Sequence, residues 1–211
     1  MGTLSGSNDP IEALAGAVLH GNTPLALEAM EKALEARYSF EEIVVRGILK
    51  AHLEFGEWYD RDPVGALKAW EFCFFTTNKV LKILDSKIPP PPNPPLSALV
   101  ATVRSEGHIT MRDVITLLLK SKGLKVYSSK KGIMLGDVSQ LLSDRSLKCV
   151  VLSCTEEGTK ATLDAFVKGI RAARPDIKIV AGGPFAGWSG ADVVLQDPMK
   201  LYDTIMALQK A

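Results

Sequence analysis

The first part of the chain places apolar residues at helical spacing, in segments separated by short polar stretches. Four such segments cover residues 9–22, 23–38, 39–59 and 62–84. A capping residue followed by proline in the first turn opens three of them, at Asp9, Thr23 and Asp62. Helices of this length joined by short connections are typical of an antiparallel bundle. The pattern therefore predicts an N-terminal four-helix bundle.

The second part of the chain alternates short apolar runs with amphipathic segments. The runs that read as strands cover residues 98–103, 124–129, 147–154, 177–183 and 191–196. The segments that read as helices cover residues 109–123, 135–144, 159–175 and 197–211. Apolar strands that alternate with helices predict an α/β domain, in which a parallel sheet is covered on both faces. We expect a five-stranded sheet of flavodoxin-like order, with its ligand site outside the carboxyl ends of the strands.

A proline-rich stretch separates these two parts. Six of the twelve prolines lie between Lys87 and Ser97. Proline fixes φ and removes a backbone donor, so this stretch favours an extended, stiff spacer. We expect a helical domain over residues 1–87, a linker over residues 88–96 and an α/β domain over residues 97–211.

Composition and charge narrow the functional classes. The net charge is +1 and acidic and basic residues are interspersed, so no basic surface for nucleic acid is expected. No apolar run reaches the roughly 18 residues that a membrane span needs. The first ten residues lack the pattern of a secretory signal. The three cysteines are scattered without metal-site spacing, which favours a cytoplasmic protein.

Candidate chemistry follows three of the expected strands. The loop after the first strand holds Glu106, Gly107 and His108, the third strand ends at Ser153, and the fourth ends at Gly182-Gly183. Each feature alone is more often structural, because loop histidines, serine caps and glycine turns are common. Their shared position at one edge of one sheet favours a functional site. A phosphate-binding site is not favoured, because it would need a glycine-rich first loop. A nucleophilic role of Ser153 is not favoured either, because the G-x-S-x-G motif of a nucleophile elbow does not surround it.

The spacing of these residues resembles that of the cobalamin-binding domain of methionine synthase and of corrinoid methyl-carrier proteins. In that family the motif D-x-H-x-x-G is followed, after 41 residues, by S-x-L. After a further 26 to 28 residues comes G-G. Here Glu106-x-His108-x-x-Met111 is followed by 41 residues, Ser153-x-Thr155, 26 residues and Gly182-Gly183. The spacing agrees throughout, whereas Glu106, Met111 and Thr155 differ from the family residues. A helical bundle, a linker and this domain also match the free-standing methyl carriers.

The resemblance implies a cobalamin cofactor whose cobalt takes His108 as its lower axial ligand. Glu106 would hydrogen-bond the other imidazole nitrogen and tune it. Ser153 would hydrogen-bond the buried benzimidazole of the cofactor, and Gly182 and Gly183 would leave room for its nucleotide tail. The helical domain would cap the upper face of the corrin. The protein would then be a non-catalytic methyl-carrier subunit, with a substrate-specific methyltransferase and an acceptor methyltransferase as partners.

Two alternatives remain open from the sequence. A cobalamin-based sensor or co-regulator could use the same two domains, although no DNA-reading segment is visible. A relative that binds another ligand in the slot is favoured by Met111, which replaces the glycine of the family motif.

The helical part also carries an aromatic cluster. Its members are Phe55, Trp58, Tyr59, Trp70, Phe72, Phe74 and Phe75. Aromatic side chains dominate small cores, so we expect most of them to fill the bundle and one or two to reach a ligand or partner.

Overall fold

A computed structural model describes residues 9–129 and 131–210 of the 211-residue chain. Most of the segment inspected for a secretory signal, residues 1–8, lies outside the described range. The chain forms two compact units, Met1–Pro89 and Pro90–Ala211. Residues 88–96 form neither helix nor strand. None of the helices in the described ranges combines the length and the hydropathy that crossing a membrane requires.

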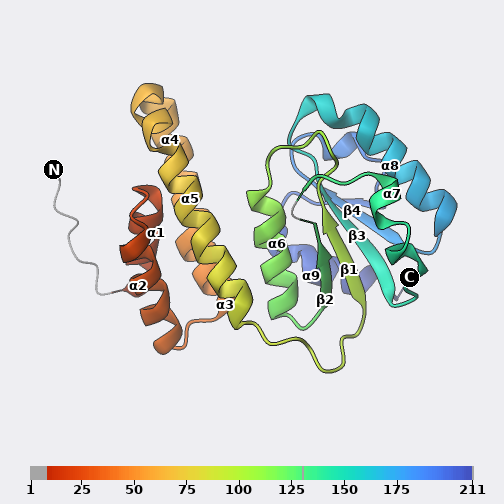
Figure 1. Ribbon diagram of the computed structural model, residues 1–211, viewed down its shortest axis with the longest axis horizontal. Helices are drawn as coiled ribbons and strands as arrows, with labels where there is room; N and C mark the ends of the chain where they lie inside the picture. The colour runs from red at the N-terminus through yellow and green to blue at the C-terminus, as the bar shows by residue number, and fades with distance from the viewer. Residues whose placement is uncertain (1–8, 130, 211) are drawn as a thin grey trace. The chain divides into compact units, whose positions relative to one another are not determined.

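The helical unit has the helices that the apolar spacing predicts (Figure 1). They are α1 (Pro10–Leu19), α2 (Thr23–Glu35), α3 (Phe40–Glu42), η1 (Ile43–Leu49), α4 (Lys50–Arg61) and α5 (Pro63–Lys87). The segments α3, η1 and α4 form one continuous helix, within which η1 is a π-helix. Gly47 of this π-helical stretch packs against Leu14 of α1, where an added Cβ would meet a leucine methyl carbon at 2.6 Å.

Three threonines take part in side-chain hydrogen bonds that connect the helices of this unit. Asn22 caps α2 by accepting the N–H of Leu25, so the expectation that Thr23 is the cap is wrong. The Thr23 hydroxyl instead lies 2.7 Å from that of Thr76, which is buried on α5. The neighbouring Thr77 hydroxyl lies 2.9 Å from Nε2 of His52 on α4.

The His52–Thr77 contact predicts a pH dependence of stability. Burial lowers the pKa of His52 from its ordinary value of 6.5, so the unfolded chain binds a proton more readily than the folded one. The free energy of unfolding should therefore be highest above pH 6.5 and should fall as the pH drops toward the folded-state pKa. Urea unfolding of the wild type and of His52→Gln at pH 8 and pH 5.5 measures this. An equal loss in both proteins would contradict the assignment to His52.

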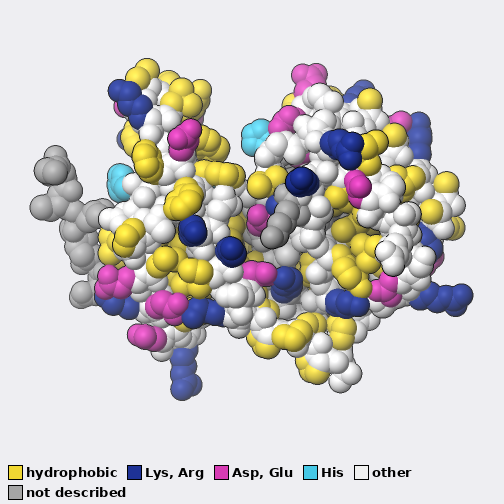
Figure 2. All heavy atoms as spheres, viewed as in Figure 1, with side chains coloured by type: hydrophobic (Ala, Val, Ile, Leu, Met, Phe, Trp, Pro, Cys, Tyr) yellow, Lys and Arg dark blue, Asp and Glu magenta, His cyan; other side chains and the backbone are white. Residues whose placement is uncertain are grey.

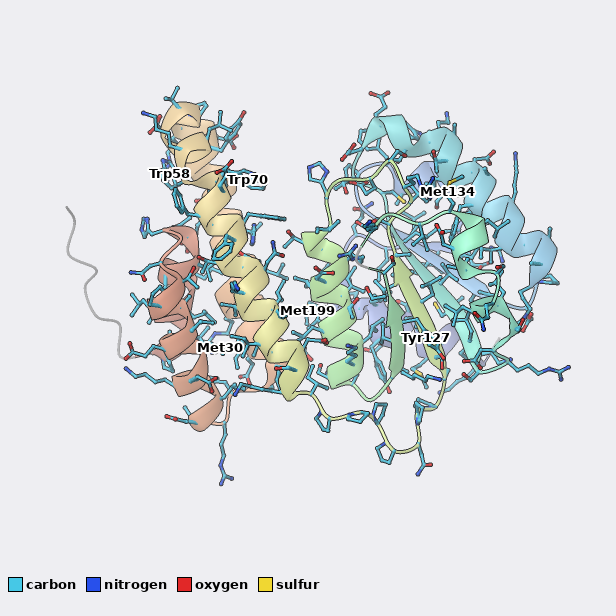
Figure 3. The ribbon with its side chains drawn as sticks, in the orientation of Figure 1. Met30, Trp58, Trp70, Tyr127, Met134 and Met199 are labelled. Atoms are coloured by element: carbon cyan, nitrogen blue, oxygen red, sulfur yellow. The ribbon has the colours of Figure 1, made fainter. Side chains whose placement is uncertain are left out.

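The aromatic cluster is not a bundle core, contrary to the expectation from sequence. Of its seven members, all of which the structure describes, Phe55 alone is buried. Phe55 packs against Trp58 and Trp70, with ring centroids 5.9 and 5.4 Å away. Trp58 and Trp70 lie on the α4 and α5 helices (Figure 3), and hydrophobic side chains reach the surface over these helices (Figure 2). Tyr59, Trp70, Phe72 and Phe75 are exposed by 40–63%.

The second unit is a parallel five-stranded sheet of order β2-β1-β3-β4-β5, which confirms the predicted flavodoxin-like fold. Its strands are β1 (Ser97–Ala101), β2 (Lys125–Ser128), β3 (Leu147–Ser153), β4 (Lys178–Gly182) and β5 (Val193–Val194). Its helices are α6 (Thr110–Ser121), α7 (Leu135–Val138), α8 (Lys160–Ala173) and α9 (Leu201–Leu208).

Helices cover both faces of the sheet (Figure 1). On one face, Ile115 and Leu119 of α6 and Ile205 of α9 pack against β1, β3 and β4. On the other face, the core includes Phe166 and Ile170 of α8. Successive side chains of a strand point to opposite faces, so β3 supplies residues to both cores. The strand order reverses between β1 and β3, and the loops after these strands therefore border the crevice where ligands of such folds bind.

Candidate functional site

Glu106 is buried in the loop between β1 and α6, and it joins two loops of the sheet edge. Its Oε1 accepts the backbone N–H of His108 at 3.0 Å. Its Oε2 accepts the N–H groups of Thr155 and Glu156, in the loop after β3, at 2.6 and 3.1 Å. One carboxylate thus links the loop after β1 to the loop after β3.

These hydrogen bonds keep Glu106 ionised. Burial by itself would raise the pKa of Glu106, but the N–H donors of His108 and Thr155 outweigh it and hold that pKa below its ordinary value. The Thr155 hydroxyl lies near enough to lower the pKa further, although its geometry does not make a hydrogen bond. The loop after β1 is thus organised around a carboxylate that accepts hydrogen bonds only.

The imidazole of His108 contacts two carboxylates through one nitrogen. Nδ1 lies 3.1 Å from Oε1 of Glu106 and 3.1 Å from Oε1 of Glu156. A neutral imidazole has one N–H donor and one acceptor nitrogen, and the partner of one nitrogen decides the tautomer. Since ionised carboxylates only accept, the neutral ring that fits these contacts is the one with its hydrogen on Nδ1 and its lone pair on Nε2. The His108 side chain is 62% exposed, so a ligand can reach the imidazole.

Glu156 is the site residue that the sequence interpretation missed. It accepts the N–H of Gly107 at 2.7 Å in addition to facing His108. It lies three positions after Ser153 and outside the motif, so no spacing rule pointed to it. In the described ranges, Glu106, His108 and Glu156 are the one group whose nitrogen and oxygen atoms lie close enough to hold a metal ion.

An apolar cavity of about 240 Å³ adjoins this group at the carboxyl ends of β3 and β4. It brings together Ser153, Thr155, Gly182, Gly183 and Met111 from the predicted site. Its remaining lining includes Ile115, Val151, Val180, Leu195 and Leu201. Thr155 connects the two features, because its side chain lines the cavity while its backbone N–H donates to Glu106.

The two altered motif positions that line the cavity are compatible with a ligand site. Met111 lies in the first turn of α6 without a positive φ, so the backbone does not require glycine there. The Thr155 hydroxyl oxygen is buried and has no hydrogen-bond partner among the described residues. A buried hydroxyl without a partner is costly, and the group it influences here is the Glu106 carboxylate, whose pKa it helps to lower.

Gly183 is required by the loop itself. Its φ is +105°, and an added Cβ would meet the carbonyl oxygen of Cys154 at 2.5 Å. The neighbouring Cys154 is buried, and burial raises the pKa of its thiol to about 12, with a further contribution from Glu106. A thiol that stays protonated is a poor nucleophile, so Cys154 is a packing residue here.

No protein-family model matches the chain, and no curated protein matches it. Among solved structures, the monomethylamine corrinoid protein of Methanosarcina barkeri aligns with a TM-score of 0.73 at 15% identity, over 97% of this chain and all of that one. The chain has the fold of a corrinoid protein. The corrinoid-protein fold thus includes both units, the helical one and the α/β one, as the resemblance implied.

Two further solved structures match at lower TM-scores. A cobalamin-binding protein from Desulfitobacterium hafniense gives 0.47 at 16% identity, over 95% of this chain and 97% of that one. The methanol:cobalamin methyltransferase complex of Methanosarcina barkeri gives 0.48 at 14% identity, over 97% of this chain and 82% of that one.

Proposed function

We propose that this protein binds a corrinoid and carries a methyl group within a methyltransferase system. One observation supports this above the others: two carboxylates face Nδ1 of His108, whose exposed side chain lies near an apolar cavity. Imidazole nitrogen is a suitable donor for a borderline metal ion such as cobalt. A metal-binding nitrogen and an apolar slot are the two features that cobalamin with a displaced lower base needs.

Each site residue then has a defined task. His108 would hold cobalt through Nε2, and Glu106 would fix the orientation of the ring. Ser153 and Thr155 would hydrogen-bond the tail of the corrinoid, and the apolar lining would exclude water from its base. The bound corrinoid would supply a cobalt that accepts and releases a methyl group. The protein would be a carrier, with a methyl-donating and a methyl-accepting methyltransferase as its partners.

Comparison of two corrinoids tests this proposal. The purified protein is mixed with cobalamin or with cobinamide, which lacks the nucleotide tail, and the corrinoid retained after desalting is measured by its visible absorption. Because the cavity binds the tail, cobalamin should bind at least tenfold more tightly, which is about 1.4 kcal/mol. Equal retention of both would show that the cavity is not used for the tail. Retention of neither would overturn the corrinoid proposal.

A further inference from the structure

Glu156 reaches from the loop after β3 to the loop after β1 and contacts both the backbone and the imidazole there. Its Oε1 accepts the N–H of Gly107 at 2.7 Å and lies 3.1 Å from Nδ1 of His108. An added Cβ at Gly107 would meet this same oxygen at 2.9 Å. The absence of a side chain at position 107 therefore lets the second carboxylate approach the imidazole.

The second carboxylate supplements one that already has several donors. Glu106 accepts three backbone N–H groups in addition to facing Nδ1. The Oε1 atoms of Glu106 and Glu156 are equivalent toward the ring, because each accepts one backbone N–H and lies 3.1 Å from Nδ1. Charge-assisted hydrogen bonds are about twice as strong as neutral ones, so an added carboxylate at Nδ1 has a large effect on the ring.

We propose that Glu156 is a positioning residue that, together with Glu106, holds the hydrogen of His108 on Nδ1 and presents Nε2 as the free nitrogen. The negative charge of Glu156 also makes Nε2 a stronger electron donor to a metal ion, as carboxylate partners of ligating histidines do. The part of this proposal that concerns cobalt rests on the proposed function. The part that concerns the tautomer is a property of the protein without cofactor.

The tautomer can be read directly by NMR. Full-length protein labelled with ¹⁵N-histidine and free of cofactor is studied at pH 8 by long-range proton–nitrogen correlation, which distinguishes a protonated from an unprotonated ring nitrogen. The wild type should show Nδ1 protonated and Nε2 unprotonated at His108. Glu156→Ala should shift both His108 signals toward a mixture of tautomers. His20 and His52, in the helical unit, serve as internal references.

Glu157→Ala is the matched control, because Glu157 is the adjacent, exposed carboxylate and has no contact with His108. It should leave the His108 signals as in the wild type. If Glu156→Ala does not fold, Glu156→Gln preserves the size of the side chain and removes its charge, and it should give an intermediate shift. Unchanged His108 signals in both Glu156 variants, or an Nε2-protonated wild type, would overturn the proposal.

Measurements on the protein with cobalamin bound separate this proposal from the proposed function. With cobalamin bound, Glu156→Ala should weaken histidine coordination about tenfold, as seen from the visible spectrum. Should the tautomer shift occur while no corrinoid is retained by any variant, the role of Glu156 stands and the corrinoid function falls. Should corrinoid be retained with the His108 signals unchanged in Glu156→Ala, the function stands and the role of Glu156 falls.

Discussion

His108→Ala should still retain cobalamin but lose the visible spectrum of histidine-coordinated cobalt. The side chain of His108 is exposed and supports no packing, so its removal leaves the fold and the cavity intact. Cobalt would lose the protein nitrogen that holds it, and the affinity should fall at least about tenfold, the loss seen when even the partners of metal ligands are removed. Methyl transfer to an acceptor should fall with it. Absorption spectra of desalted wild type and variant, each mixed with methylcobalamin, measure this directly.

His20→Ala is the control for His108→Ala. His20 is an exposed histidine of the helical unit, with Trp58 as its ring neighbour at 6.3 Å between centroids. Its removal should leave the spectrum unchanged. If retained corrinoid gave identical spectra in the wild type and in His108→Ala, the cofactor would remain and His108 would not be its ligand.

Glu106→Ala should be the most destabilising single change at the site. It leaves the backbone N–H groups of His108, Thr155 and Glu156 without the buried carboxylate that accepts them, in loops that are themselves exposed or half-buried. An unsatisfied buried donor costs about 1–3 kcal/mol, and solvent reaches part of these loops, so a total loss of about 2 kcal/mol in the free energy of unfolding is expected. Urea unfolding measures the total, and hydrogen exchange at these three amides measures the local part.

Glu106→Gln provides a graded comparison, because its amide oxygen still accepts hydrogen bonds while its amino group does not. It should lose less stability than Glu106→Ala, and Glu157→Ala should lose almost none. The folded-state pKa of Glu106 is below its ordinary value of 4.5, so its stabilisation is present above that pH and is lost as the pH falls below it. The stability difference between wild type and Glu106→Gln should therefore narrow in acid. Equal stability of the wild type and Glu106→Ala would show that the two loops hold together without this carboxylate.

The fold could be predicted from local sequence patterns because each element buries its own apolar face. The run of apolar residues in β3 and the helical spacing in α6 and α8 each determine an element, and their alternation determines a parallel sheet. The positions of His108 and Ser153 followed from the same reasoning, since parallel strands bring their carboxyl ends to one edge. The predicted fold class is confirmed, and the solved corrinoid protein shares this fold.

Contacts between residues far apart in the sequence could not be predicted from local patterns. Glu156 reaches His108 across 48 positions of sequence, and nothing in the residues around it differs from an ordinary helix start. The Thr23 hydroxyl was assigned to a local cap, but a partner 53 positions away competes for it and Asn22 takes the cap. The aromatic residues of α4 and α5 were assigned to a core, because hydrophobicity alone does not say which face of a helix is covered.

The sequence by itself thus determined the order of the elements, the parallel sheet and the edge of it at which His108 and Ser153 lie. These depend on periodicity, proline content and the direction of parallel strands, all of which act over a few residues. The tertiary structure decided which carboxylates face Nδ1 of His108 and which aromatic side chains remain exposed. Those properties depend on distances between side chains far apart in the chain, and short-range patterns carry no information about such distances.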